Sequence, residues 1–354
     1  MGVTTLMIAG GGTGGHIYPA IAIAREFIAR DAARRVIFVG TEYGLEKTIV
    51  PANGFPIEFI SVGGLKGKGP VDLAKNLFKL PLGFLQAWSA VGRNKPQAVL
   101  GVGGYSSGPV LLAAWLRGVP TILHEQNAFP GLTNRMAAKF VRAVAVAFED
   151  AAPRLNRRDA VVTGNPVRKE FFEVVRSAEA KRILVFGGSQ GSKVLNDAMT
   201  AALAHLPRDL EIVHQTGPRM LDEVRKAYRD SPFPEARVVA YIDPMVDEIL
   251  AAELVICRAG AMTIAELAAA GRGAVLIPFA AATNNHQEAN ARVMERAHAA
   301  VVITESELTP ERLAGAVREI VETPGRSAQM AAAAKSLATV EATKRIVDTI
   351  EKII

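Results

Sequence analysis

Blocks of apolar and polar residues alternate along the chain in a pattern that predicts strands and helices in turn. Short runs rich in apolar and β-branched residues predict the strands of the first half. They are Thr5–Ala9, Val36–Val39, Ile57–Ile60, Ala98–Leu100, Thr121–Leu123 and Ala143–Val146. Apolar residues recur at helical spacing between them, at Tyr18–Ala29, Val110–Leu116 and Leu132–Ala138. Strands and helices that alternate in this way build a parallel sheet covered by helices.

The pattern breaks once, near Val161–Arg168, where Gly164, Asn165 and Pro166 follow one another. Strands are then predicted again, at Arg182–Phe186, Glu211–His214, Arg237–Ala240, Leu254–Cys257, Ala274–Ile277 and Ala300–Ile303. Both halves open alike, with a strand, a glycine-rich turn and a helix, at Leu6–His16 and Ile183–Lys193. We therefore expect an α/β protein of two Rossmann-like, doubly wound parallel-sheet domains that face a cleft, divided between residues 163 and 164.

The composition is that of a globular protein. Of 354 residues, 49% are apolar and 21% are charged, which is enough for two domains with cores of their own. The single cysteine, Cys257, cannot form an internal disulfide, so a reducing cytoplasm is the expected compartment. No export signal is evident at the start. The uncharged stretch Pro96–Leu116 has the length of a membrane span, but its glycines, serines and Pro109 favour a strand, a glycine loop and a buried helix.

Charge is spread unevenly over the two halves. Residues 1–163 carry 18 Lys and Arg against 10 Asp and Glu, a net charge of +8, and residues 164–354 carry 23 against 25, a net charge of −2. A basic first half suggests an anionic partner, such as phosphate, a membrane surface or nucleic acid. Nucleic acid is disfavoured, because this half lacks the interleaved aromatic and basic residues that stack bases.

Three glycine loops follow predicted strands. The first, Gly10–His16, contains GxGxxG, but the second strand ends without an acid before Glu42, which argues against a dinucleotide cofactor. The loop Gly187–Lys193 is not a phosphate-binding Walker motif, because Val194 follows its lysine. The third loop is Gly103–Pro109. Three such loops in one chain point to phosphate handling by backbone N–H groups.

Two polar segments of the first half are candidates for catalysis. His16 stands where the first helix is predicted to begin, and a helix N-terminus keeps an imidazole neutral, so His16 can serve as a general base. A capping or packing role is the alternative. The segment His124–Asn127 follows a strand and lacks the second histidine of HExxH, so we predict no zinc. Within it, Glu125 is either a second candidate base or a buried structural partner.

The second half offers two polar segments for a nucleotide sugar. Arg258–Glu266 runs from a strand end into a helix, where Glu266 is placed to accept hydrogen bonds from a ribose diol. A solvated helix glutamate is the alternative. Thr283–Asn290 is rich in amides, which suit sugar hydroxyls, although helix capping would also explain Asn284 or Asn285.

An apolar stripe lies beside lysines in Val71–Trp88. Leu73, Leu77, Leu80, Phe84 and Trp88 recur at helical spacing, interrupted by Pro81. The neighbouring lysines are Lys66, Lys68, Lys75 and Lys79. This pattern predicts either a segment that enters the interface of an anionic membrane or a face packed in the core.

Seven motifs carry a family resemblance and span nearly the whole chain. In order they are GGTGGH at Gly11–His16, GGYSSGP at Gly103–Pro109, HEQN at His124–Asn127, GNPVR at Gly164–Arg168, GGSQGS at Gly187–Ser192, RAGAMTIAE at Arg258–Glu266 and HQ..NA at His286–Ala291. Together they resemble the MurG family of peptidoglycan N-acetylglucosaminyltransferases, which convert lipid I to lipid II.

The resemblance implies a GT-B fold. Residues 1–163 would form the domain that faces the acceptor and the membrane, and residues 164–340 the domain that binds the UDP-sugar. Residues 341–354 would form a helix that crosses back to the first domain. The enzyme would be peripheral, on the cytoplasmic face of the plasma membrane, with UDP-N-acetylglucosamine, lipid I, the anionic inner leaflet and other proteins of cell-wall synthesis as its partners.

The resemblance also implies roles for single residues. Thr13, Gly14 and Gly15 would line the cleft, Asn127 would contact the donor sugar, and Arg168 and Ser189 would lie near its diphosphate. Ile242 would meet uracil through its backbone, and Ala261, Met262, Thr263 and Glu266 would flank phosphate and ribose. Gln287 would hold the sugar hydroxyls, although His286 could exchange roles with it. Tyr105, His124 and Gln190 are further candidates for substrate binding.

The implied reaction is an inverting transfer of N-acetylglucosamine, with His16 or Glu125 as the base and with neither a metal nor another cofactor. Two alternatives remain open from the sequence. One is a GT-B glycolipid synthase with a different lipid acceptor, and the other is a regulator that binds a UDP-sugar without catalysis.

Overall fold

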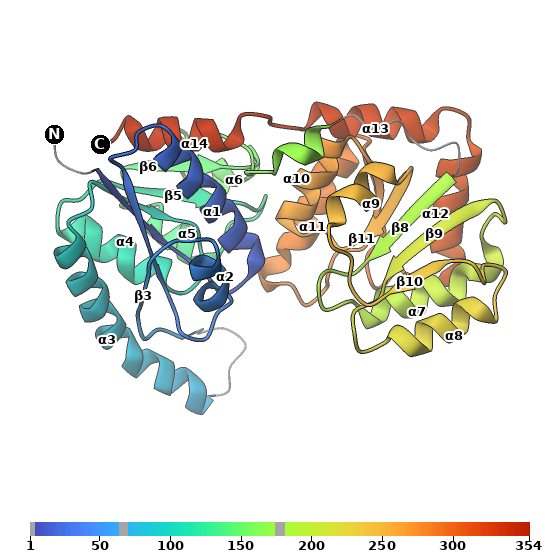
Figure 1. Cartoon of the computed structure of the whole chain (residues 1–354), viewed down its shortest axis with the longest axis horizontal. Coiled ribbons are helices and arrows are strands. Elements are labelled where there is room, and N and C mark those ends of the chain that lie inside the picture. Colours follow the sequence, from blue (N-terminus) through green and yellow to red (C-terminus); the bar gives the residue numbers. More distant parts are fainter. Residues whose placement is uncertain (1–3, 64–69, 174–180) are drawn as a thin grey trace. The chain divides into compact units, whose positions relative to one another are not determined.

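The computed structural model describes residues 4–63, 70–173 and 181–354, and it describes the side chains of all of these except residues 70–79. The chain divides into two compact units (Figure 1). The first unit comprises Met1–Val167 and Glu341–Ile354, and the second comprises Arg168–Val340.

The first unit is a parallel sheet with helices on both faces. Its strands are β1 (Thr5–Ala9), β2 (Arg35–Gly40), β3 (Ile57–Phe59), β4 (Ala98–Gly101), β5 (Thr121–Glu125), β6 (Ala143–Val146) and β7 (Val161–Val162). Its helices are α1 (Gly14–Ala29), α2 (Glu46–Ala52), α3 (Pro70–Asn94), α4 (Ser107–Leu116), α5 (Leu132–Ala137), α6 (Ala151–Arg154) and α14 (Ala342–Glu351). The strand order is β3-β2-β1-β4-β5-β6-β7, with every pair parallel.

The sheet buries apolar residues on both faces because side chains alternate along each strand. In β1, Met7 belongs to the core beneath α3, α4 and α5, while Leu6 and Ile8 belong to the core beneath α1. The helix α14 packs in this second core through Ile346 and Ile350, and Figure 1 shows it alongside α1. The C-terminal segment is thereby part of the first unit.

Ion pairs also join α14 to α1. The guanidinium of Arg30 lies 2.7 Å from carboxylate oxygens of both Asp348 and Glu351, and Arg34 lies 2.7 Å from Glu351. These pairs are partly exposed, so we attribute the attachment of α14 mainly to its apolar face.

The second unit repeats the same architecture. Its strands are β8 (Lys181–Phe186), β9 (Leu210–Gln215), β10 (Arg237–Val239), β11 (Leu254–Cys257), β12 (Gly273–Leu276) and β13 (Ala300–Val302). Its α-helices are α7 (Lys193–Ala202), α8 (Leu221–Arg229), α9 (Met245–Ala251), α10 (Ala261–Ala270), α11 (His286–Arg296), α12 (Pro310–Glu322) and α13 (Arg326–Ser336), with short 3₁₀ turns at Lys169–Phe172, Leu203–His205 and Thr283–Asn285. All pairs in the order β10-β9-β8-β11-β12-β13 are parallel.

The fold class predicted from the sequence is confirmed, and each predicted strand is present within one or two residues. The short strand β7 falls in the segment predicted as a break. The interruption expected at Pro81 was wrong, because α3 continues through this residue. Among the described residues, no helix combines the length and apolar character needed to cross a lipid bilayer.

Candidate functional site

In each sheet the order of the strands reverses at one point, between β1 and β4 and between β8 and β11, and the glycine loops lie there. In the first unit β1 is flanked by β2 and β4, so the loops that follow β1 and β4 meet at the carboxyl edge of the sheet. The ring of His16 lies against Gly103, whose φ is +93°, and a Cβ at this glycine would stand 3.0 Å from the His16 Cε1 atom. Gly103 therefore leaves room for the imidazole.

A buried carboxylate holds the first glycine loop. Glu46, at the start of α2, accepts hydrogen bonds from the N–H of Gly12 (2.7 Å), the N–H of Thr41 (2.9 Å) and the hydroxyl of Thr41 (2.8 Å). A Cβ at Gly11 would stand 2.3 Å from the Glu46 carboxyl carbon, so the glycine is needed for this approach. The N–H of Gly12 in this loop is therefore bonded to a carboxylate of the protein itself.

His16 is joined to the segment after β5 by a side-chain hydrogen bond. Its Nδ1 atom lies 3.0 Å from Oε1 of Gln126, and Nε2 of Gln126 lies 3.2 Å from Nδ1 of His124. Nε2 of His124 in turn lies 3.2 Å from the carbonyl oxygen of Gly164. His124 is fully buried, and burial lowers its pKa to about 4, so this ring is neutral at physiological pH.

Glu125 is buried and serves as an acceptor within its own loop. One of its oxygens accepts from the N–H and the side-chain amide of Asn127, at 2.9 and 3.1 Å. The other accepts from the N–H of Gly131 (3.1 Å) and the side-chain amide of Asn134 (2.8 Å). Four donors on one carboxylate favour the structural role that the sequence left open for Glu125.

The remaining predicted residues of the first unit lie at the same sheet edge. Thr13 is exposed and precedes α1, whose first residues are Gly14 and Gly15. Tyr105 is 53% exposed, in the loop between β4 and α4. These residues therefore surround His16 from the two loops that the strand order brings together.

The second glycine loop lies at the equivalent point of the second sheet, between β8 and α7. The hydroxyl of Ser192 caps α7 by accepting from the N–H of Leu195 at 3.3 Å. Arg258, at the end of the adjacent strand β11, donates to the Ser192 hydroxyl at 2.7 Å and pairs with Glu305 at 2.6 Å. Ser189 and Gln190 are exposed at the tip of the loop.

Glu266 lies on α10 in the same unit, half-buried. Burial raises its pKa to about 7, while the positive charge of Arg168 acts in the opposite direction. Ala261, Met262 and Thr263, in the first turn of α10, are also half-buried. A helix N-terminus with a perturbed carboxyl group one turn further on is suited to a phosphate and a ribose.

Gln215 links the backbone of Ile242 to the second glycine loop by hydrogen bonds. It accepts from the N–H of Ile242 at 2.9 Å and donates to the carbonyl of Gly188 at 3.0 Å. Because the N–H of Ile242 is already bonded, a backbone contact with a base would use its carbonyl oxygen.

Residues near the start of α11 are held by local hydrogen bonds. Gln287 accepts from the N–H of Phe279 at 3.0 Å, and Nδ1 of His286 lies 2.8 Å from the carbonyl of Thr283. Asn284 and Asn285 both have a positive φ, near +56°, so they form the turn before α11. The predicted residues of this half thus collect near the carboxyl edge of the second sheet.

Sequence reasoning assigned no individual role to four residues that shape these sites, Glu46, Gln126, Gln215 and Arg258, although the polar series His124–Asn127 was expected to orient an acceptor sugar. Gln126 lies in the HEQN motif and Arg258 in the RAGAMTIAE motif, so their place in a motif was the signal that could have identified them. Nothing in the local pattern marks Glu46 or Gln215 as a support of a glycine loop, because Gly12 lies 34 residues from Glu46 and Gly188 lies 27 residues from Gln215.

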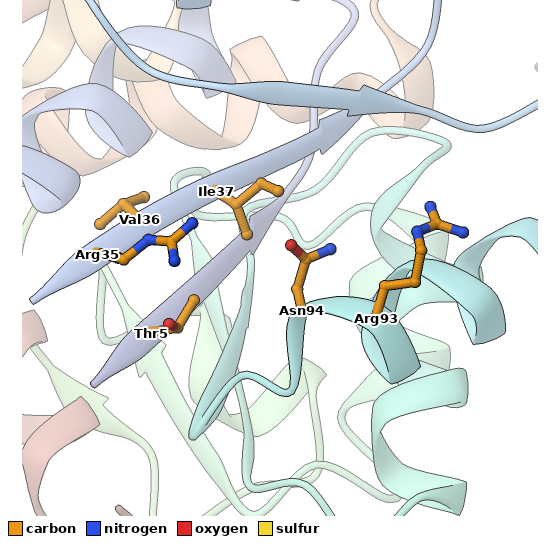
Figure 2. Close-up of a pocket in the computed structure, with 6 residues that line it drawn as sticks. All are labelled: Thr5, Arg35, Val36, Ile37, Arg93 and Asn94. Carbon is orange, nitrogen blue, oxygen red and sulfur yellow. The ribbon is translucent and has the colours of Figure 1, made fainter. Parts of the chain in front are cut away.

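A cavity of about 220 Å³ lies elsewhere in the first unit (Figure 2). Its lining residues are Thr5, Arg35, Val36, Ile37, Arg93 and Asn94. It opens at the amino ends of β1 and β2, whereas the motifs lie at the carboxyl ends. This cavity is therefore separate from the candidate site.

Known proteins match the chain along nearly its whole length. The family model of the glycosyltransferase family 28 N-terminal domain matches residues 6–146, and that of the C-terminal domain matches residues 182–349. A UDP-N-acetylglucosamine--N-acetylmuramyl-(pentapeptide) pyrophosphoryl-undecaprenol N-acetylglucosamine transferase of Myxococcus xanthus (strain DK1622) is 47% identical over 350 residues, which cover 97% of this chain and 91% of the relative.

Solved structures are similar as well. Acinetobacter baumannii MurG has a TM-score of 0.84 at 32% identity, with 99% of both chains covered. The glycotransferase of kitacinnamycin has a TM-score of 0.74 at 18% identity, again over 99% of both chains, which shows a shared fold alone. The resemblance carried by the seven motifs is confirmed, and the chain is a glycosyltransferase that belongs to the MurG family.

Proposed function

We propose that this chain transfers N-acetylglucosamine from UDP-N-acetylglucosamine to the 4-hydroxyl of the N-acetylmuramoyl group of lipid I, forming lipid II. The observation that carries the proposal is the setting of His16. Its imidazole stands at the start of α1, against Gly103, with Nδ1 bonded to Gln126. A neutral imidazole fixed in this way suits the deprotonation of a hydroxyl.

The second unit would hold the donor. The loop Gly187–Lys193 and the first turn of α10 would offer helix N-termini to the diphosphate, and Arg168, whose charge acts on Glu266 of α10, would add a positive charge. Glu266 would accept from the ribose hydroxyls, Ile242 would meet uracil, and Gln287 would hold the sugar.

The reaction would be a single inverting displacement. The acceptor oxygen forms a bond to the anomeric carbon as the bond from that carbon to the UDP oxygen breaks. The proton of the acceptor hydroxyl passes to Nε2 of His16. Negative charge grows on the departing UDP, where the helix N-termini and Arg168 stabilise it.

His16 is a better candidate for the base than Glu125. The four donors to Glu125 occupy both of its oxygens. Proton transfer to Glu125 would disrupt the loop that these bonds hold. We therefore assign Glu125 to the support of Asn127, which would contact the donor sugar.

We further propose that the first unit docks on an anionic membrane surface through α3, α4 and α5. Neighbouring helices expose large apolar side chains, namely Leu82, Leu85, Leu112, Trp115, Leu116, Leu132 and Met136. Exposed cations lie among them at Arg117 and Lys139. The predicted residues Leu73, Leu77, Lys66, Lys68, Lys75 and Lys79 lie outside the residues whose side chains are described.

A transfer assay tests the function. Purified protein is given labelled UDP-N-acetylglucosamine with lipid I or with diacylglycerol, and the anomeric configuration of the product is determined. We expect transfer to lipid I alone, with inversion. Transfer to diacylglycerol alone would indicate the glycolipid synthase, and donor binding without any product would indicate the regulator.

The variant His16→Ala tests the assignment of the base. We expect transfer to fall about 10²- to 10⁴-fold, the usual contribution of a general base, while UDP-N-acetylglucosamine still binds. Transfer near the wild-type rate would show that another group accepts the proton.

A further inference from the structure

Four groups of the first unit form a continuous chain of hydrogen bonds along the carboxyl edge of its sheet. The chain runs from His16 through Gln126 and His124 to the carbonyl oxygen of Gly164, with separations of 3.0, 3.2 and 3.2 Å. His16 follows β1, His124 and Gln126 lie at the end of β5 and just after it, and Gly164 follows β7, so the strand order brings them together.

The last group in the chain fixes the direction of every bond. A carbonyl oxygen only accepts, so Nε2 of His124 must carry a proton and donate to Gly164. His124 is neutral, because burial holds its pKa near 4. A neutral imidazole carries one proton, so Nδ1 of His124 is an acceptor and faces the amide nitrogen of Gln126.

A second contact fixes the orientation of the Gln126 amide. Its Nε2 atom also lies 3.3 Å from the carbonyl oxygen of His124, so a flipped amide would point its oxygen at two acceptors. The side chain of Asn165 donates to the Gln126 carbonyl at 2.9 Å and holds its backbone. The oxygen of the Gln126 side chain must therefore face His16 and accept a hydrogen bond from its Nδ1–H.

We propose that Gln126 and His124 are positioning residues that keep the proton of neutral His16 on Nδ1, so that Nε2 bears the lone pair that accepts the proton of the acceptor hydroxyl. The inference rests on the proposed function, in which His16 is the base. In this scheme Gly164 and Asn165 hold His124 and Gln126 in place by hydrogen bonds. His124 acts on His16 through Gln126, without touching the substrate.

The side chain at position 126 also places no formal charge beside the ring of His16. A carboxylate in this place would stabilise the imidazolium by a full charge and raise the pKa of His16. A neutral amide orients the ring without this effect, and the N-terminus of α1 also disfavours the imidazolium.

The tautomer can be measured without the reaction. Protein labelled with ¹⁵N-histidine gives nitrogen shifts that distinguish a protonated from an unprotonated ring nitrogen, and His16→Ala assigns the signals. We expect His16 of the wild type to be protonated on Nδ1 and the variant Gln126→Met to lose this preference. A wild-type His16 protonated on Nε2, or an unchanged tautomer in Gln126→Met, would overturn the inference.

Kinetics provide the second readout. Gln126→Met should lower kcat about 10- to 100-fold, less than the loss of the base itself, with KM for UDP-N-acetylglucosamine unchanged. Gln126→Glu should move the pH at which kcat/KM reaches half its maximum upward by about one unit or more. Unchanged kcat in Gln126→Met, or an unmoved pH profile in Gln126→Glu, would contradict the inference.

Gln86→Met is the matched control. Gln86 accepts from the N–H of Ser61 at 2.6 Å in the same unit, so the variant loses a comparable hydrogen bond away from the site. We expect its kcat and its His16 tautomer to be those of the wild type, and a loss like that of Gln126→Met would overturn the specific role of Gln126. If His16→Ala keeps its activity while the tautomer is as expected, the proposed base fails and the positioning chain stands.

Discussion

The glycine loops Gly10–His16 and Gly187–Lys193 are similar in sequence, but they form hydrogen bonds with side chains of opposite charge. The first loop follows β1 and the second follows β8, the strands at which the strand order of each sheet reverses, and each loop leads into a helix. The first loop donates the N–H of Gly12 to the carboxylate of Glu46. The second accepts, through Ser192, a hydrogen bond from the guanidinium of Arg258.

The sign of the neighbouring charge separates the tasks of the loops. A carboxylate that already occupies the N–H of Gly12 repels a further anion there, whereas Arg258 attracts one, although Glu305 offsets part of its charge. We infer that the second loop serves the donor diphosphate and that the first loop serves mainly to place His16. A glycine-rich sequence alone does not distinguish these roles.

Among the tests of this comparison between the loops, the largest expected effect comes from removal of the cation beside the second loop. Arg258→Met should weaken UDP-N-acetylglucosamine binding about 10- to 100-fold, because a charge-assisted hydrogen bond to the loop is lost. It should also lower the free energy of unfolding by about 3 kcal/mol, because Glu305 is left without its partner. Titration calorimetry and urea unfolding measure the two effects.

Arg258→Lys keeps the positive charge but not the forked guanidinium, so its affinity for UDP-N-acetylglucosamine should lie between those of the wild type and Arg258→Met. A folded Arg258→Met protein that binds the donor as tightly as the wild type would remove the proposed distinction between the loops.

The anion behind the first loop should act differently. Glu46→Gln should lower transfer about 10-fold and the free energy of unfolding by about 1–3 kcal/mol, because an amide cannot accept all three hydrogen bonds. Donor affinity should not change. Glu26→Gln, which removes a surface ion pair with Arg30 in the same unit, is the control and should alter unfolding by less than about 1 kcal/mol. Donor affinity reduced by Glu46→Gln would show that the first loop also serves the diphosphate.

Membrane binding should distinguish the two units. Trp115→Ser and Leu85→Ser should each weaken binding to vesicles that contain phosphatidylglycerol about 5- to 10-fold, since each removes exposed apolar area. Val340→Ser, an exposed position of the second unit, should leave it unchanged. Added salt should weaken the wild type. Equal binding to vesicles of phosphatidylcholine alone would argue against an anionic surface as the partner.

The smallest expected effect is a pH dependence of donor binding. The pKa of Glu266 is raised to about 7, so its carboxyl group is largely protonated below that pH and ionised above it. The ionised form accepts from both ribose hydroxyls, so KM for UDP-N-acetylglucosamine should fall about 3-fold as the pH rises from about 6 to about 8. The doubly esterified diphosphate of the donor keeps its charge over this range.

Glu266→Gln should remove this dependence and hold KM near its low-pH value. A wild-type KM that stays constant over the range, or a variant that retains the slope, would show that Glu266 does not contact the donor in its ionised form.

Much of the molecule could be predicted from the sequence. Strands such as Thr5–Ala9 and Leu254–Cys257 were predicted with their observed bounds, because an apolar run between turn residues has few other solutions. The weak internal duplication predicted two sheets with loops at corresponding places. The helical spacing of Val71–Trp88 was predicted with an interruption at Pro81, but α3 continues through this proline, which removes one backbone hydrogen bond without ending the helix.

The sequence by itself determined the order of the elements, the positions of the glycine loops and membership of the family. Only the tertiary structure decided which side chain forms a hydrogen bond with each loop. Gly12 and Glu46 are 34 residues apart, Ser192 and Arg258 are 66 apart, and His16 and Gln126 are 110 apart. Hydrogen bonds over such separations depend on the order of strands in a sheet, and a local pattern of residues does not contain that order.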